Sequence, residues 1–107
     1  VGTAGEGLPQ MFHMMNEARV GVGLAGAMLA CRGYRMSLDY ARERRQGRNK
    51  GAGGGPQVPI IEHADVRRML LAQKAISQGA TSLVLYSARL VDEEKTAESE
   101  EARGAAR

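Results

Sequence analysis

The fold of this chain is decided by residues 9–47, which read PQMFHMMNEARVGVGLAGAMLACRGYRMSLDYARERRQG. Pro9 suits the first position of a helix, where a backbone N–H is not needed, and no other proline follows before Gln46. Gly47 is a natural helix stop, and the arginines before it complement the negative end of a helix dipole. Apolar and small residues recur at the three- and four-residue spacing of a helix face: Met11, Met14, Met15, Ala18, Val22, Ala25, Leu29 and Met36. This pattern predicts a helix over residues 9–46.

The rest of the chain predicts a second long helix and the start of a third. Residues 47–59 are rich in glycine and proline and read as a linker without regular structure. A second apolar stripe predicts a helix over residues 61–92, and residues 96–107 read as the start of a third. The expected fold class is all-α, with two long antiparallel helices and the start of a third. Because two helices leave half of each apolar stripe uncovered, we expect part of an up-down four-helix bundle, completed by more sequence or by another copy.

Length and composition exclude several classes of protein. A chain of 107 residues holds one domain at most, which rules out a complete Rossmann dehydrogenase or TIM barrel. The single Cys31 can form no intrachain disulfide and favours a reducing, cytoplasmic setting. His13 and His63 lack the spacing of metal ligands, so we expect no metal site, and no catalytic constellation is visible. No run of 18 apolar residues is present, so we expect no membrane span.

One motif needs a separate interpretation, because residues 21–26 (GVGLAG) match the dinucleotide fingerprint G-x-G-x-x-G. That fingerprint requires a preceding strand and a tight strand-to-helix turn, whereas the flanking residues here have a helical pattern. We interpret the glycines as small residues on a helix face that let another backbone pack close. Each glycine costs a helix up to about 1 kcal/mol relative to alanine, which close packing can offset.

Arginines suggest two places where an anionic or polar group could bind. A basic stretch over residues 32–50 ends in a cluster that includes Arg44 and Arg45, and this cluster could complement the helix dipole, bind phosphate or bind nucleic acid. Nucleic acid is disfavoured, because no aromatic residues interleave with the arginines. Arg19 stands in an apolar neighbourhood and needs a partner. That partner could be Glu17, Asn16, a carbonyl, a partner helix or a ligand.

Three blocks of sequence resemble the C-terminal helical domain of the FAD-dependent acyl-CoA dehydrogenases. They are residues 7–23 (GLPQMFHMMNEARVGVG), 40–48 (YARERRQGR) and 59–71 (PIIEHADVRRMLL). The last block resembles the branch of larger bacterial members that includes 3-methylmercaptopropionyl-CoA dehydrogenase. The resemblance implies an oxidoreductase of fatty acid metabolism, a flavoprotein that desaturates the α,β bond of an acyl-CoA. Hydride would pass to FAD, and electrons would leave to an electron-transfer flavoprotein. The resemblance also implies a homo-oligomer.

The resemblance places two groups of site residues. Met15, Asn16 and Arg19 fall where the family lines the acyl-CoA site. Arg44 falls where the family places an arginine that reaches across the dimer interface to the FAD pyrophosphate. Gln46 falls at a neighbouring polar contact, and His63 falls near the flavin of the partner subunit.

Three departures from the family pattern bear on activity. The family's catalytic base is a glutamate followed by Gly-Thr, and this chain contains no Glu-Gly-Thr. The β-domain that carries the flavin in this family would lie upstream, and Ala64 stands where the bacterial branch usually has proline. We therefore expect a fragment that is inactive in isolation. The alternatives are a small basic helical hairpin that binds nucleic acid and a structural module that self-associates.

Overall fold

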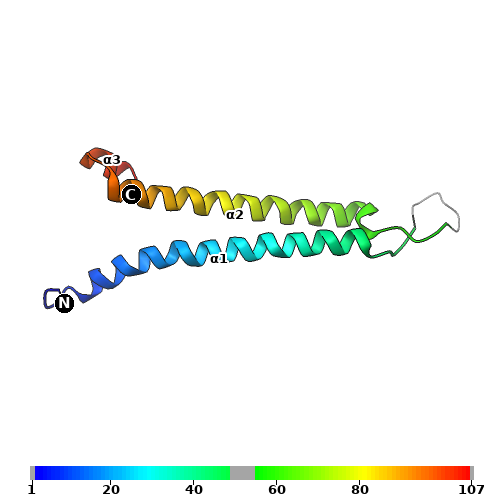
Figure 1. Cartoon of the computed structure of the whole chain (residues 1–107), viewed down its shortest axis with the longest axis horizontal. Coiled ribbons are helices and arrows are strands. Elements are labelled where there is room, and N and C mark those ends of the chain that lie inside the picture. The colour runs from blue at the N-terminus through cyan, green and yellow to red at the C-terminus, as the bar shows by residue number, and fades with distance from the viewer. Residues whose placement is uncertain (1, 49–54, 107) are drawn as a thin grey trace. The chain divides into compact units, whose positions relative to one another are not determined.

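A computed structural model describes residues 2–48 and 55–106, apart from the side chains of His13 and Glu17. Its elements are α1 (Gly7–Glu43), the 3₁₀ helix η1 (Ile60–Glu62), α2 (Ala64–Thr96) and α3 (Glu100–Ala105), as Figure 1 shows. The described residues form helices and no strand, which confirms the all-α prediction.

The chain divides into two compact units, which are described separately. The loop unit is Met28–Ala80 and contains the connection between α1 and α2. The terminal unit consists of Val1–Ala27 and Thr81–Arg107.

The first helix ends earlier than predicted, at Glu43 and not at Gln46. The residues after Glu43 turn into an extended segment that pairs with the residues before η1. Arg45 and Pro59 form an antiparallel bridge, and the Gln46 N–H donates to the Val58 carbonyl over 2.9 Å. A backbone that pairs in this way cannot continue the helix. The predicted linker 47–59 is therefore tied at both ends, while its residues 49–54 lie outside the described residues.

The other helix bounds also differ from those predicted. The start of α1 lies at Gly7 and not at Pro9, because the turn before it leads directly into helical bonds: the Gln10 N–H donates to the Glu6 carbonyl. The second helix runs over Ala64–Thr96 and not over residues 61–92, because η1 occupies the first predicted turn. The third helix is Glu100–Ala105, shorter than the predicted 96–107, because Ser99 caps it: its Oγ accepts from the Ala102 N–H over 3.2 Å.

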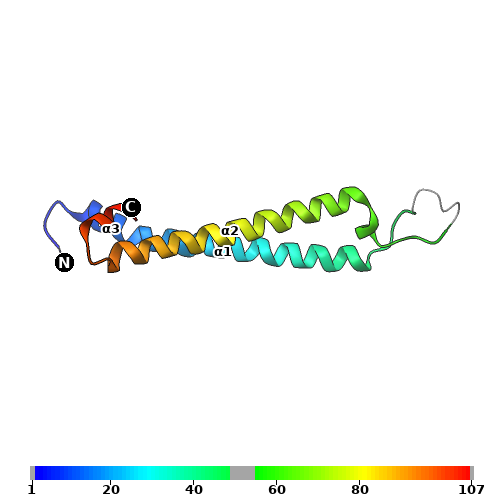
Figure 2. The same ribbon diagram turned by 90° about the horizontal axis from the view of Figure 1, so that it is seen from above.

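In the loop unit, residues 28–43 of α1 and 64–80 of α2 lie side by side in both views (Figures 1 and 2). The contact is built from small residues with one leucine: Ala41 and Ser77 are 2% exposed and Leu70 is 8% exposed. The Ser77 hydroxyl donates to the Lys74 carbonyl within its own helix, so its burial leaves no unmet hydrogen bond. The Cys31 thiol lies 3.8 Å from the Ser77 carbonyl, as expected where small residues bring helices close together.

In the terminal unit, residues 7–27 of α1 meet the last part of α2 more sparsely. Ala27 is its one fully buried apolar residue among those described, while Val20, Val84 and Val91 are half-buried. The surface of α2 here carries an ion pair in which Arg89 donates to Glu93 over 2.7 Å. This hydrogen bond and the charge of Glu93 raise the pKa of Arg89.

One apolar stripe of the pattern predicted for α1 faces away from α2. Val22, Leu29 and Met36 stand seven residues apart and are 74%, 70% and 62% exposed. The residues turned inward are a second series with the same spacing: Val20, Ala27, Tyr34 and Ala41. Periodicity locates an apolar stripe but does not say which partner covers it, so the sequence alone did not assign the stripe that meets α2.

Candidate functional site

The connection between α1 and α2 brings together the three residues predicted to contact a cofactor. Arg44 follows the last residue of α1, and its carbonyl accepts from the Ile60 N–H over 2.8 Å. Two residues later, the Gln46 carbonyl lies 2.7 Å from Nε2 of His63, which precedes α2. Residues that are distant in sequence therefore meet at one end of the loop unit.

The arginines at this connection differ in what they bind. Arg45 Nη1 donates to the Gln57 carbonyl over 3.0 Å, and Arg48 Nε donates to the Gly55 carbonyl over 2.6 Å. Both side chains thus join the segment that follows α1 to the segment that precedes η1. Arg44 is exposed, and its guanidinium makes no hydrogen bond or ion pair within residues 2–48 and 55–106. Among the described residues of this cluster, Arg44 therefore keeps all the donors of its guanidinium available to an anion, whereas Arg45 and Arg48 each use one on a loop carbonyl.

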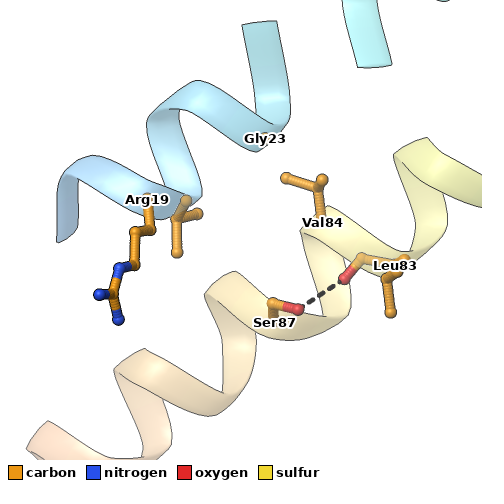
Figure 3. Close-up of a pocket in the computed structure, with 6 residues that line it drawn as sticks. Arg19, Gly23, Leu83, Val84 and Ser87 are labelled. Carbon is orange, nitrogen blue, oxygen red and sulfur yellow. Dashed lines mark hydrogen bonds between the residues drawn. The ribbon is translucent and has the colours of Figure 1, made fainter. Parts of the chain in front are cut away.

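A second candidate site is a shallow hollow in the terminal unit (Figure 3). Val84 points toward Gly23 across it, and the Ser87 hydroxyl donates to the Leu83 carbonyl over 2.9 Å. The hydroxyl hydrogen is therefore used within α2, which leaves a mainly apolar surface with one guanidinium at its edge. Its lining residues are Arg19, Val20, Gly23, Leu83, Val84 and Ser87.

The three predicted substrate residues do not contribute equally to this hollow. Arg19 lines it, and Arg19 Nη1 donates to Asn16 Oδ1 over 3.1 Å. Asn16 is thus the partner that Arg19 needs within this chain and also orients its guanidinium. Met15 is half-buried on α1 and is not among the lining residues.

Sequence reasoning missed most of the lining, because the register of α2 against α1 cannot be read from one chain. The available signal was Gly23, the middle glycine of the rejected nucleotide motif. A Cβ at Gly23 would stand 3.4 Å from Val84 Cγ2, whereas Cβ atoms at Gly21 and Gly26 would meet nothing within 4 Å. Within this chain, Gly23 meets the side chain of Val84, whereas the close packing expected at Gly21 and Gly26 is not made by α2 and stays a prediction for a further element.

Two further kinds of feature are absent from the described residues. They contain no group of three or more His, Cys, Asp or Glu side chains arranged to hold a metal ion. None of their helices combines the length and the apolar character needed to cross a membrane.

Comparison with known proteins identifies the family of this chain. The family model described as "Acyl-CoA dehydrogenase, C-terminal domain" matches residues 5–106. A butyryl-CoA dehydrogenase of Syntrophomonas wolfei is 40% identical over 99 residues, covering 92% of this chain and 16% of the relative. The 3-methylmercaptopropionyl-CoA dehydrogenase of Ruegeria pomeroyi is 42% identical over 92 residues, covering 86% of this chain and 16% of the relative.

A third relative is the broad-specificity linear acyl-CoA dehydrogenase FadE5 of Mycobacterium tuberculosis, which is 38% identical over 95 residues, again covering 86% of this chain and 16% of the relative. The chain thus spans about one sixth of the length of these relatives. The match covers nearly the whole chain and confirms the resemblance carried by the three sequence blocks. The chain belongs to the acyl-CoA dehydrogenase family and corresponds to its C-terminal helical domain.

Proposed function

We propose that this chain acts as the C-terminal helical domain of a flavoprotein that desaturates the α,β bond of an acyl-CoA. The observation that carries the proposal is the exposed guanidinium of Arg44, which has no partner among the described residues, beside two arginines that are bound to loop carbonyls. In this proposal the domain supplies one contact to FAD and one wall of the acyl-CoA site. FAD, when bound, supplies the two-electron acceptor for the desaturation.

The flavin contact is assigned to Arg44, with Gln46 as its polar neighbour. A guanidinium presents its donors in a planar fork that matches the oxygens of a diphosphate, and its charge is permanent at neutral pH. The Arg44 backbone is held by hydrogen bonds to Tyr40 and Ile60, so the side chain starts from a fixed point. In this proposal the contact reaches the FAD of a second subunit, which makes the active enzyme a homo-oligomer.

The substrate contact is assigned to the hollow at Arg19. Its apolar lining suits an acyl chain, and the guanidinium at its edge suits a polar part of the thioester substrate. The residues that line the hollow are not carboxylates, and the base that removes the α-proton is proposed to come from another part of the protein. The chain alone is proposed to be inactive, and in the complete protein electrons leave to an electron-transfer flavoprotein.

The uncovered apolar surface supports a role as part of a larger assembly. Among the described residues, three apolar side chains are fully buried, while long ones such as Leu29, Ile76 and Leu83 are 65–70% exposed. So small a core cannot offset the conformational entropy of ordering a chain of this length. The exposed stripes are proposed to pack against the remaining helices of a four-helix bundle.

The test is Arg44→Ala in the complete flavoprotein. Hydrogen bonds to a charged group contribute about 1.5–3 kcal/mol, so the Kd for FAD should rise by about ten- to hundredfold, measured from flavin fluorescence. Arg42→Ala is the matched control, because Arg42 lies in the last turn of α1 and its charge faces Asp39 at 3.9 Å. An unchanged FAD affinity in Arg44→Ala would contradict the proposal.

A further inference from the structure

We infer that His63 is a positioning residue for the flavin contact: its imidazole holds the Gln46 carbonyl and so fixes the segment that carries Arg44 and Gln46. The inference rests on the function proposed above. It differs from the expectation that His63 itself lies against the flavin. The role assigned to His63 is to fix the position of the backbone from which the Arg44 side chain extends.

The hydrogen bond between His63 and Gln46 determines the state of the ring. Nε2 lies 2.7 Å from the Gln46 carbonyl oxygen, which can only accept, so Nε2 must carry a hydrogen. The donor of this nitrogen is therefore committed within the chain and is not available to a ligand. The ring is half-buried, which favours one fixed orientation.

The backbone of His63 is held on both sides, so its ring starts from a rigid base. Its N–H donates to the Ile60 carbonyl over 3.1 Å and closes η1. Its carbonyl accepts from the Arg67 N–H over 3.1 Å in the first turn of α2. The imidazole thus connects the start of α2 to the segment that leaves α1.

Gly47 shows how closely the chain passes the ring. Its φ of +75° is in the left-handed region that favours glycine. A Cβ added at Gly47 would stand 2.9 Å from both Cε1 and Nε2 of His63, closer than real contacts allow. The glycine is therefore required here for two reasons, its backbone conformation and the space taken by the His63 ring.

A fixed starting point matters because binding a diphosphate orders a flexible side chain. Backbone bonds already hold Arg44 and Gln46 to Ile60 and Val58. The hydrogen bond from His63, the residue before α2, restrains this segment further. Each such bond reduces the conformational entropy that must be lost when FAD binds. Loss of the imidazole should weaken flavin binding without removing any group that touches the flavin.

The experiment compares His63→Leu with His63→Gln in the complete flavoprotein. Loss of one hydrogen bond should raise the Kd for FAD by about three- to tenfold in His63→Leu. Glutamine carries an amide donor that can reach the same carbonyl, so His63→Gln should recover most of the affinity. An unchanged Kd in His63→Leu, or a glutamine variant as weak as the leucine variant, would overturn the inference.

A double-mutant cycle with Arg44→Ala distinguishes positioning from general stabilisation. If His63 acts through Arg44, His63→Leu should change the Kd for FAD much less in the Arg44→Ala background than in the wild type. Equal effects in the two backgrounds would overturn the inference. If Arg44→Ala alone has no effect, the proposed function fails. If only His63→Leu has no effect, the positioning role fails.

Gly47→Ala tests the contact between the His63 ring and the segment after α1 by changing the glycine and keeping the histidine. It should displace the imidazole and raise the Kd for FAD in the same way as His63→Leu. Gly5→Ala is the matched control, because Gly5 has a φ of +92° but a Cβ there would meet nothing within 4 Å. Wild-type FAD affinity in a folded Gly47→Ala variant would overturn the inference.

Discussion

The loop unit and the terminal unit are built from the same two helices but differ in how many residues they bury and in the hydrogen bonds that hold them. The loop unit buries Ala41, Leu70 and Ser77 and ties its loop with backbone pairs and arginine side chains. The terminal unit buries only Ala27 among its described residues and leaves a hollow edged by Arg19. The loop unit thus has the more tightly bound connection, while both units leave long apolar side chains exposed, such as Ile76 in the loop unit and Leu83 in the terminal unit.

The difference is compatible with the two roles proposed above, a flavin contact in the loop unit and an acyl-CoA wall in the terminal unit. A precise charge contact needs a fixed backbone, which hydrogen bonds provide at the α1–α2 connection. A wall for an acyl chain needs apolar surface and room, which small residues such as Gly23 provide. Variants that affect one unit and spare the other would sharpen this comparison.

The largest expected loss of stability comes from Leu70→Ala in the loop unit. Leu70 is 8% exposed, and removing a buried leucine side chain costs about 2–5 kcal/mol. The control is the same change at the next residue, Leu71, which is 67% exposed. Urea unfolding of the complete protein should show the larger loss for Leu70→Ala. Equal losses would mean that the two positions are equally covered in the assembled protein.

A smaller effect is expected from Gly23→Val in the terminal unit. The new side chain would press on Val84, and overpacking of this kind costs about 1–3 kcal/mol. It would also fill the hollow, so the KM for acyl-CoA should rise while the Kd for FAD stays the same. Gly21→Val places the same side chain in open space and should leave KM unchanged. Equal KM values in the two variants would argue against the hollow as the substrate wall.

The smallest effect is expected from Ser99→Ala at the start of α3. Loss of an N-cap costs about 1 kcal/mol, and here it affects a helix of six residues. Hydrogen exchange should show faster exchange of the α3 amides, with the midpoint of global unfolding unchanged. Ser82→Ala, an exposed position within α2, is the control. A large shift of that midpoint would show that α3 contributes to the core.

Much of the fold could be predicted from local sequence. The absence of proline between Pro9 and Gln46 and the repeated apolar spacing were sufficient to predict two long helices. The end of α1 was misplaced, because it depends on the bridge between Arg45 and Pro59, which are 14 residues apart. Local sequence could not show which stripe of α1 meets α2, because Val22, Leu29 and Met36 form an apolar stripe that stays exposed in this chain.

The candidate site was predicted from family resemblance, and its internal arrangement was not. The sequence placed arginines near the end of the helix, but it could not show that Arg45 and Arg48 bind loop carbonyls while Arg44 does not. The sequence also could not predict the hydrogen bond between His63 and the Gln46 carbonyl, because every residue has a backbone carbonyl and residue type does not show which one is used. The ligand roles of these residues and of Met15, Asn16 and Arg19 remain proposals for the experiments above.

The two seven-residue series on α1 have a consequence for how its length can change. One series meets α2 and the other, with Val22, Leu29 and Met36, is exposed in this chain. Each residue turns a helix by about 100°, so inserting or deleting one residue inside α1 would rotate the residues beyond that point. One series would then turn away from α2, and the other would turn away from the helices proposed to cover it. Length variation among relatives should therefore be tolerated poorly within α1 and far better in the segment that joins it to α2.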